Sequence, residues 1–91
     1  MKLLLFTQAT CPKCPEAKRV VEGIDIKKEF WDINEPFGLG EAAWWDVITT
    51  PSIVLTKDNK EVKGWRSIVP SKEDILAAIG SIENVKRSIV Y

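Results

Sequence analysis

Two cysteines that lie three positions apart place the strongest constraint on how this 91-residue chain can fold. The segment Cys11-Pro12-Lys13-Cys14 follows a short apolar run and opens a stretch whose apolar residues repeat at helical spacing. Two thiols at the start of a helix can close into a disulfide with little movement of the backbone. The helix N-terminus and the neighbouring Lys13 would both stabilise a thiolate at Cys11, which lowers the pKa of that thiol. The pattern predicts a redox-active dithiol at a strand-to-helix junction.

Two other roles for the cysteine pair must be weighed against redox chemistry. A structural zinc site needs four ligands, usually Cys or His, and this chain has two Cys and no His. Such a site would therefore require carboxylates or a second chain. A purely structural disulfide would close a very short loop, and short loops restrict the unfolded chain least. We therefore favour a pair that cycles between dithiol and disulfide, with no metal at the site.

Length and composition narrow the class of protein. Ninety-one residues make one domain, which we expect to span residues 1–91. Thirteen basic and thirteen acidic residues cancel, so no charge excess favours nucleic acid or an anionic membrane. The apolar run of residues 3–6 is shorter than the roughly 7–15 residues of a signal peptide, and no stretch approaches the roughly 18 of a membrane span. We expect a cytoplasmic monomer that binds neither nucleic acid nor membrane.

Hydrophobic spacing predicts the elements of the first third of the chain. Residues 2–6 form a continuous apolar run, which is typical of a strand buried on both faces. Helical spacing then begins at Pro12, a residue type that suits the first helical position, and stops at Gly23. A second strand over residues 26–33 would complete a right-handed parallel β-α-β unit.

The middle of the chain predicts a helix and then a hairpin. The helix covers residues 37–47, and two strands follow over residues 52–56 and 60–65. Asp58-Asn59 lies between these strands and favours a tight reversal, so the two strands should pair antiparallel.

The last part of the chain predicts helical structure. Ser71 and Asp74 have the spacing of a capping box, with Asp in place of the usual Glu. The helix that they open would end at Gly80, and residues 81–91 would form a second short helix.

Two segments resemble the thioredoxin/glutaredoxin superfamily. Residues 6–14 are similar to the glutaredoxin segment that ends in CPYC, and residues 50–55 are similar to the Thr-Pro strand of the family. The resemblance covers residues 2–80, and the chain has the length of the small, glutaredoxin-like redoxins. The resemblance implies an α/β, thioredoxin-like fold. That fold has a four-stranded mixed sheet in the order 2-1-3-4, flanked by helices, with an extra C-terminal helix here.

The resemblance also implies a dithiol-disulfide oxidoreductase that needs no prosthetic group. Cys11 would attack a substrate disulfide as a thiolate, and Cys14 would then resolve the mixed disulfide. The bond before Pro51 would be cis, and the backbone of Thr50 would pair with the incoming peptide. The other residues expected to contact a substrate are Pro12, Lys13 and Trp65.

Departures from the family pattern bear on the electron donor. Glutathione-using glutaredoxins carry Gly-Gly and then Asp after the last strand, whereas this chain has Gly64-Trp65-Arg66-Ser67. Trp65 would fill the glutathione space, and Ser67 lacks the carboxylate. The CGPC motif of typical thioredoxins, and the acid buried under it, are also missing.

The Gly-Trp-Arg run is similar to the Gly-Phe-Arg of redoxins that reduce ribonucleotide reductase with electrons from a flavoprotein. We therefore expect protein disulfide substrates, with ribonucleotide reductase as one candidate, and a donor of the thioredoxin-reductase type. The alternatives are a glutathione-dependent glutaredoxin, or a metal or iron–sulfur cluster carrier that uses Cys11.

Overall fold

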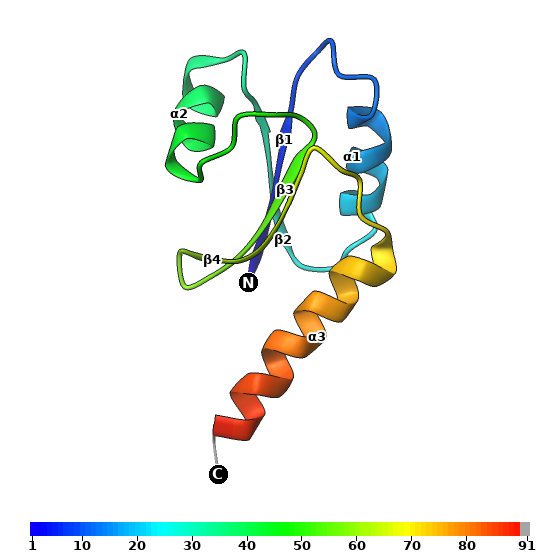
Figure 1. Cartoon of the computed structure of the whole chain (residues 1–91), viewed down its shortest axis with the longest axis vertical. Helices are drawn as coiled ribbons and strands as arrows, with labels where there is room; N and C mark the ends of the chain where they lie inside the picture. The colour runs from blue at the N-terminus through cyan, green and yellow to red at the C-terminus, as the bar shows by residue number, and fades with distance from the viewer. Residues whose placement is uncertain (90–91) are drawn as a thin grey trace.

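The described part of the chain folds into one mixed sheet of four strands flanked by three helices (Figure 1). The computed structural model describes residues 1–89, with side chains as far as residue 82. In chain order, the elements are β1 (Lys2–Thr7), α1 (Cys14–Glu22), β2 (Lys27–Asp32), α2 (Pro36–Trp44), β3 (Ser52–Lys57), β4 (Lys60–Arg66) and α3 (Lys72–Ile89). This succession confirms the order of strands and helices that the sequence predicts.

Strand β1 occupies an inner position in the sheet, whose order is β2-β1-β3-β4. β1 runs parallel to β2 and antiparallel to β3, and β4 pairs antiparallel with β3. The parallel pair is joined through α1, as the β-α-β prediction requires. In the register, Leu5 lies between Phe30 on β2 and Ile53 on β3. The predicted mixed sheet is therefore confirmed.

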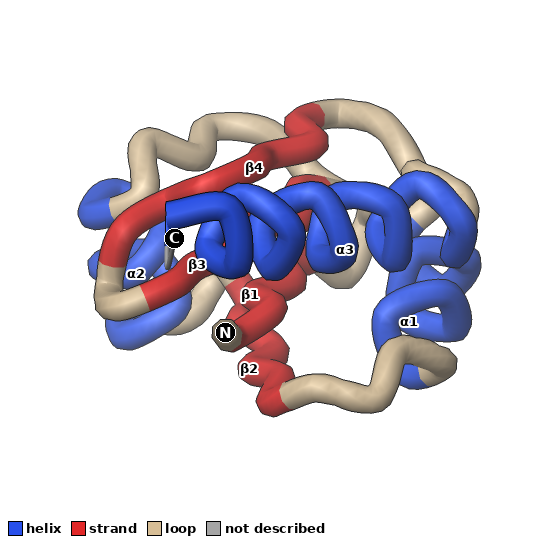
Figure 2. Tube along the Cα trace, turned by 90° about the horizontal axis from the view of Figure 1, so that it is seen from below, coloured by secondary structure: helices blue, strands red, loops and turns tan. Residues whose placement is uncertain are grey.

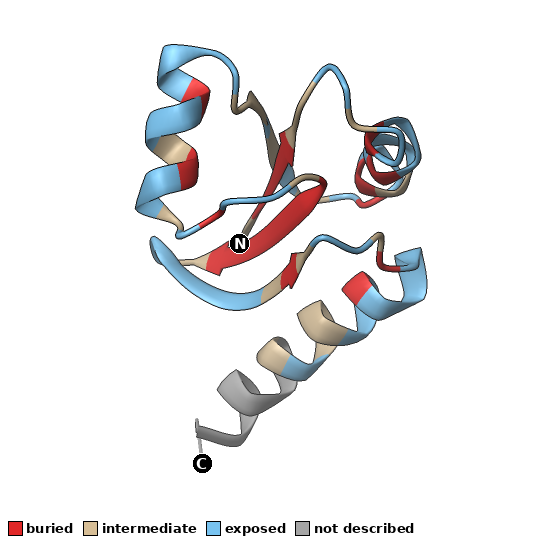
Figure 3. Cartoon of the chain, turned by 45° about the horizontal axis from the view of Figure 1, so that its top comes forward, coloured by how far each residue is buried: buried red, intermediate tan, exposed pale blue. Residues whose placement is uncertain are grey.

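The apolar run in β1 is buried on both faces of the sheet. Leu3 and Leu5 contribute to a core cluster that α1 and α3 cover, with Val21 and Ile75 among its members. Alternate β1 residues point to the opposite face, where Phe6 belongs to a second cluster under α2. Figure 3 shows the resulting band of buried residues along the inner strands. Strand β1 thus contributes side chains to the core clusters on both faces of the sheet.

Two local turn predictions are confirmed. Asp58 and Asn59 both have positive φ, 54° and 63°, as a tight hairpin reversal between β3 and β4 requires. At the start of α3, the backbone N–H of Asp74 donates to Ser71 Oγ at 3.1 Å. The N–H of Ser71 in turn donates to Asp74 Oδ2 at 3.2 Å. This reciprocal pair is the predicted capping box, with Asp in the role of Glu.

The predicted helix bounds need two corrections. α2 ends at Trp44, earlier than the predicted residue 47, and Asp46 just beyond it has a positive φ of 59°. α3 does not end at Gly80 but continues to Ile89 as one helix (Figure 2). A glycine inside a helix costs only about 1 kcal/mol relative to alanine, and no proline follows Gly80 to stop the helix. Residues 90 and 91 of the predicted second helix lie outside the described residues.

Gly38 and Gly40 lie two residues apart in α2 and provide a matched pair for testing its packing. A Cβ on Gly38 would clash with the backbone carbonyl of Asp32, whereas a Cβ on Gly40 would meet nothing within 4 Å. We expect Gly38→Ala to destabilise the fold by about 1–3 kcal/mol through overpacking. Gly40→Ala should instead stabilise it by about 0.5–1 kcal/mol, through helix propensity. Urea unfolding of both variants tests this, and equal effects would contradict the close approach of α2 to β2.

Candidate redox site

The two cysteines lie together at the end of β1 and the start of α1. Cys11 and Cys14 form a disulfide, and their Cα atoms are 5.4 Å apart. The backbone N–H of Cys11 donates to the carbonyl of Gln8 at 3.0 Å, which closes the turn that leaves β1. Cys11 is half-buried and Cys14 is only 6% exposed. The pair is therefore accessible from solvent mainly through Cys11.

The helix begins later than the sequence predicts. Pro12 lies in a turn before α1, so its predicted place at the first helical position is wrong, and Cys14 is the first helical residue. Pro15 lies in the first turn of α1, where a missing N–H costs nothing because that group has no partner within the helix. Pro12 and Lys13 are both exposed, in the turn between the two cysteines.

The loop before β3 lies next to the turn that carries the cysteines. The Thr50–Pro51 peptide bond is cis, as predicted. Thr50 Oγ1 donates to Gln8 Oε1 at 3.4 Å, so a side-chain contact links this loop to the turn that ends at Cys11. Pro51 is buried and Thr50 is half-buried. The structure therefore brings four of the predicted site residues to one end of the sheet, namely Cys11, Cys14, Thr50 and Pro51.

A surface cleft of about 390 Å³ opens beside the disulfide on the side of β2. It is lined by Thr7, Gln8, Ala9, Cys11, Cys14, Pro15, Lys18 and Asp32. The sequence analysis did not assign Lys18 or Asp32 to the site. For Lys18 a signal exists, because it lies four residues after Cys14 on α1 and so on the same face of the helix. Asp32 reaches the cleft only through the pairing of β2 with β1.

Comparison with known proteins decides the family. No family model matches the chain. A thioredoxin of Methanocaldococcus jannaschii is 33% identical over an alignment of 85 positions, which covers 87% of this chain and 92% of that protein. The chain belongs to the thioredoxin family. With its cysteine pair at disulfide distance, it is a thiol-disulfide oxidoreductase.

Solved structures show the same fold at lower sequence identity. Thioredoxin 1 from Thermosipho africanus matches with a TM-score of 0.74 and 21% identity, over 96% of this chain and 99% of that one. A malaria parasite thioredoxin-2 matches with a TM-score of 0.73 and 21% identity, over 88% and 81% of the two chains. A chain from a complex of ferredoxin:thioredoxin reductase with thioredoxin f2 matches with a TM-score of 0.63 and 23% identity, over 90% and 76%.

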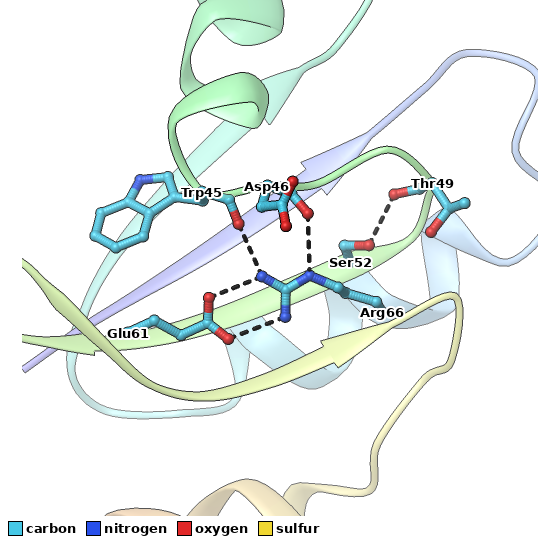
Figure 4. Close-up of polar contacts among 6 residues, drawn as sticks. All are labelled: Trp45, Asp46, Thr49, Ser52, Glu61 and Arg66. Carbon is cyan, nitrogen blue, oxygen red and sulfur yellow. Dashed lines mark hydrogen bonds and ion pairs between the residues drawn. The ribbon is translucent and has the colours of Figure 1, made fainter.

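In this thioredoxin-family chain, Arg66 ties the loop after α2 to strand β4 (Figure 4). Its guanidinium donates to both carboxylate oxygens of Glu61, at 2.7 and 2.9 Å. It also donates to the backbone carbonyls of Trp45, at 2.8 Å, and Asp46, at 3.4 Å. These bonds fix the start of the segment that continues to Thr50 and Pro51. The sequence analysis did not identify Arg66 or Glu61 as part of the site.

The far end of the same segment is held by residues next to Arg66. The N–H of Ser67 donates to the Pro51 carbonyl at 3.0 Å, and Ser67 Oγ hydrogen-bonds to Thr49 Oγ1. Ser52 Oγ donates to the Thr49 carbonyl at 2.7 Å (Figure 4). The loop that flanks the cysteines is thus fixed at both ends, by Arg66 at the end of β4 and by Ser67 directly after it.

Trp65 packs in the core and does not line the cleft beside the disulfide. Its side chain is only 7% exposed and belongs to the core cluster under α3, together with Ile53 and Ile75. Lys63 Nζ lies 6.0 Å from the centre of its ring. The structure therefore does not bring Trp65 to the cleft that contains Cys11, although the sequence analysis placed it among the substrate contacts.

None of the helices described has the combination of length and apolar character that crossing a membrane requires.

The Glu61–Arg66 pair predicts how stability changes with pH. Hydrogen bonding from Arg66 holds the pKa of Glu61 below its ordinary value, and the same contact raises the pKa of Arg66. A carboxyl whose pKa is lowered on folding stabilises the fold above its unfolded pKa, and that contribution is lost as the pH falls through the folded value.

We expect Glu61→Gln to cost about 0.2–1 kcal/mol near neutral pH, because both side chains are partly exposed. The cost should shrink as the pH falls through the lowered pKa of Glu61, because the carboxyl of the wild type then becomes protonated as well. Urea unfolding of both proteins across this range measures the difference. A cost that stays constant with pH would contradict the ion pair as its source.

Proposed function

We propose that the protein reduces protein disulfides, with Cys11 as the attacking thiol and Cys14 as the resolving thiol. The observation that carries this assignment is the unequal exposure of the pair, since Cys11 is half-buried and Cys14 is 6% exposed. The Cys11 thiolate attacks one sulfur of the substrate, and the other substrate sulfur leaves as a thiolate. Cys14 then attacks the Cys11 sulfur, which releases the second substrate thiolate and leaves the Cys11–Cys14 disulfide.

The surface on the β3 side of the disulfide is the proposed place for the substrate backbone. Thr50 and Pro51 lie there in a loop that is fixed by hydrogen bonds from Arg66 and Ser67. A fixed loop loses little entropy when a peptide pairs with it, which favours binding. Pro12 and Lys13 are exposed beside Cys11 and would contact the same partner. The reaction takes place in the cytoplasm, where a lone cysteine pair is more often catalytic than structural.

A flavoprotein reductase of the thioredoxin-reductase type is the proposed electron donor, and ribonucleotide reductase is a candidate substrate. Glutathione-using glutaredoxins carry an aspartate after the last strand, where this chain has Ser67. Ser67 is neutral and bonds to Thr49 and Pro51, so the ammonium of glutathione finds no carboxylate on it. One protein of the same fold comes from a complex of ferredoxin:thioredoxin reductase with thioredoxin f2, which supports a reductase protein as donor.

The unequal cysteines can be tested by alkylation and trapping. In the reduced protein at neutral pH, we expect Cys11 to react with iodoacetamide well before Cys14, because Cys14 is only 6% exposed. The Cys14→Ser variant should accumulate mixed disulfides with protein substrates, whereas Cys11→Ser should trap none. Mass spectrometry of the alkylated peptides and of the trapped complexes measures both results. Trapping through Cys14 would reverse the two roles.

The donor can be tested by turnover with competing reductants. We expect faster turnover with NADPH and a thioredoxin reductase than with glutathione and its reductase. Ser67→Asp should increase turnover with glutathione, because a hydrogen bond to a charged group contributes roughly 1.5–3 kcal/mol, or about 10- to 150-fold. Asp tolerates the positive φ of 65° at this position.

Ser67→Asn is the matched control, because it has a similar shape and tolerates the same backbone but carries no charge. It should leave turnover with glutathione low. Wild-type turnover with glutathione that equals turnover with the reductase would overturn the proposed donor and favour a glutathione-dependent glutaredoxin.

A further inference from the structure

The outward side of α2 is apolar along its whole length. The helix packs on the sheet through Gly38 and Ala42, which are both buried. The helical period turns five uncharged residues away from the sheet, and all five are exposed: Phe37, Leu39, Gly40, Ala43 and Trp44. Figure 3 shows this exposed side turned away from the strands. A helix that is apolar on every side is normally buried, yet nothing in the described part of the chain covers this outward side, which we call the α2 face.

The large side chains of the α2 face expose a substantial apolar area. Phe37 is 84% exposed, Trp44 76% and Leu39 60%. Since an aromatic side chain offers about 150–250 Å² of surface, these three together expose roughly 300–500 Å². Apolar patches of about this size on a monomer are often binding sites. A stable dimer needs about 800 Å² per partner, whereas transient redox encounters need less, so the area favours a partner that binds and then leaves.

Carboxylates border the α2 face. Glu35 directly precedes the helix, Asp46 follows its end, and Glu41 lies on its flank, one turn from both Phe37 and Trp44. No lysine or arginine occurs between residues 33 and 56. The helix therefore presents an apolar surface with a negatively charged border.

Arg66 contacts the end of this segment, but its charge is already paired. Its guanidinium binds both carboxylate oxygens of Glu61, besides the backbone carbonyls of Trp45 and Asp46. The border thus remains acidic, which opposes docking of a second copy through the same face, because like charges would meet. An anionic membrane would be repelled for the same reason. The charges favour a protein whose apolar surface is bordered by lysine and arginine.

The α2 face is continuous with the loop that flanks the disulfide. Residues 45–51 connect α2 to β3, and Ile48 in this connection is 86% exposed, directly before Thr49 and Thr50. α1 and α2 cover opposite faces of the sheet (Figure 1). A partner that covers the α2 face and also reaches the disulfide at the start of α1 must therefore extend across the end of the sheet. A tripeptide such as glutathione is too small for this, so the occupant is a folded protein.

We propose that the α2 face docks the electron-donating reductase, a folded protein whose own dithiol lies beside an apolar surface bordered by lysine and arginine. This inference rests on the reductase protein proposed above as the donor. The same donor must dock in every catalytic cycle, whereas the substrate proteins differ. A helix face with a fixed shape suits the partner that does not change.

The electron transfer that this docking serves balances in atoms and electrons. A donor thiolate attacks the Cys11 sulfur, and the bond between Cys11 and Cys14 breaks, so that Cys14 leaves as a thiolate and takes a proton from solvent. The second donor thiolate then attacks the first donor sulfur and releases Cys11 as a thiolate. Two electrons have passed to this protein, and the donor has gained a disulfide.

Steady-state kinetics with a reductase tests the docking. The probe is the thioredoxin reductase that, with NADPH, reduces the wild-type chain fastest in the donor assay. We expect Trp44→Gln and Phe37→Gln each to raise the KM for this chain by about tenfold, since buried aromatic anchors dominate such contacts. The kcat should stay within about twofold, because the reacting sulfurs are unchanged. The matched control is Leu76→Gln, which removes an apolar side chain that is 45% exposed on α3 and should leave the KM unchanged.

The acidic border adds a dependence on salt. We expect the wild-type KM to rise with added sodium chloride, because salt screens the attraction between the carboxylates and a basic partner surface. Glu35→Gln combined with Glu41→Gln should raise the KM at low salt and flatten this dependence. Asp58→Asn removes a carboxylate from the hairpin between β3 and β4, where asparagine fits the positive φ of 54°, and should behave as the wild type.

Four results would overturn the proposal. The first is an unchanged KM in both aromatic variants. The second is an equal loss of insulin reduction with dithiothreitol as donor, which would assign the defect to the redox site. In the third, sedimentation shows a wild-type dimer that Trp44→Gln dissociates, which assigns the face to a second copy. In the fourth, the wild type binds phosphatidylcholine vesicles and Trp44→Gln does not, which assigns it to a membrane.

Failure of the donor proposal gives a different result from failure of the docking proposal. If no thioredoxin reductase reduces the wild-type chain, the donor proposed above is wrong and the docking inference fails with it. If the wild type is reduced and the aromatic variants match it, only the docking inference fails. Circular dichroism of each variant checks that the fold is retained, which the exposure of Phe37 and Trp44 leads us to expect.

Discussion

Burial of β1 on both faces is the constraint on which the site depends. Each of the large apolar side chains from Leu3 to Phe6 is essentially inaccessible to solvent and contributes roughly 1.5–3 kcal/mol by its burial. A one-residue slip of this strand would exchange its two faces and leave both core clusters mispacked. The register therefore fixes where the chain leaves the sheet at Thr7, and the turn closed by the Cys11 N–H places the cysteines from there. Core packing thus determines the position of the redox centre.

A bulge in β4 determines how the loop before Pro51 is held next to the cysteines. Thr56 pairs with Glu61 but Leu55 pairs with Lys63, so Val62 is an extra residue in the strand. Glu61 and Arg66 are five residues apart and would face opposite sides of a regular strand. The extra residue brings them to the same side, where they form a bidentate ion pair. A Cβ on Gly64 would clash with this pair. The glycine and the bulge together let Arg66 reach the loop before Pro51.

The sequence predicted features that depend on local patterns, and it missed features that depend on pairing. The buried strand, the Asp58-Asn59 turn and the capping box at Ser71 follow from neighbouring residues. The resemblance added the sheet order and the cis bond. The Glu61–Arg66 pair was missed because strand parity does not reveal a bulge, and Asp32 because only the register of β2 brings it to the cysteines. Trp65 was expected at the substrate surface from the family resemblance, and its side chain packs in the core cluster under α3.

The two sides of the disulfide present different chemistry to a reacting substrate. On the β3 side, Thr50 and the buried Pro51 lie next to the turn that ends at Cys11. On the β2 side, Lys18 and Asp32 line a cleft that reaches both Cys11 and Cys14. Gln8 belongs to both surfaces, because it lines the cleft and accepts a hydrogen bond from Thr50 Oγ1. One short turn after β1 therefore places the disulfide between an uncharged surface and a charged one, and the register of β1 with β2 and β3 fixes the position of both.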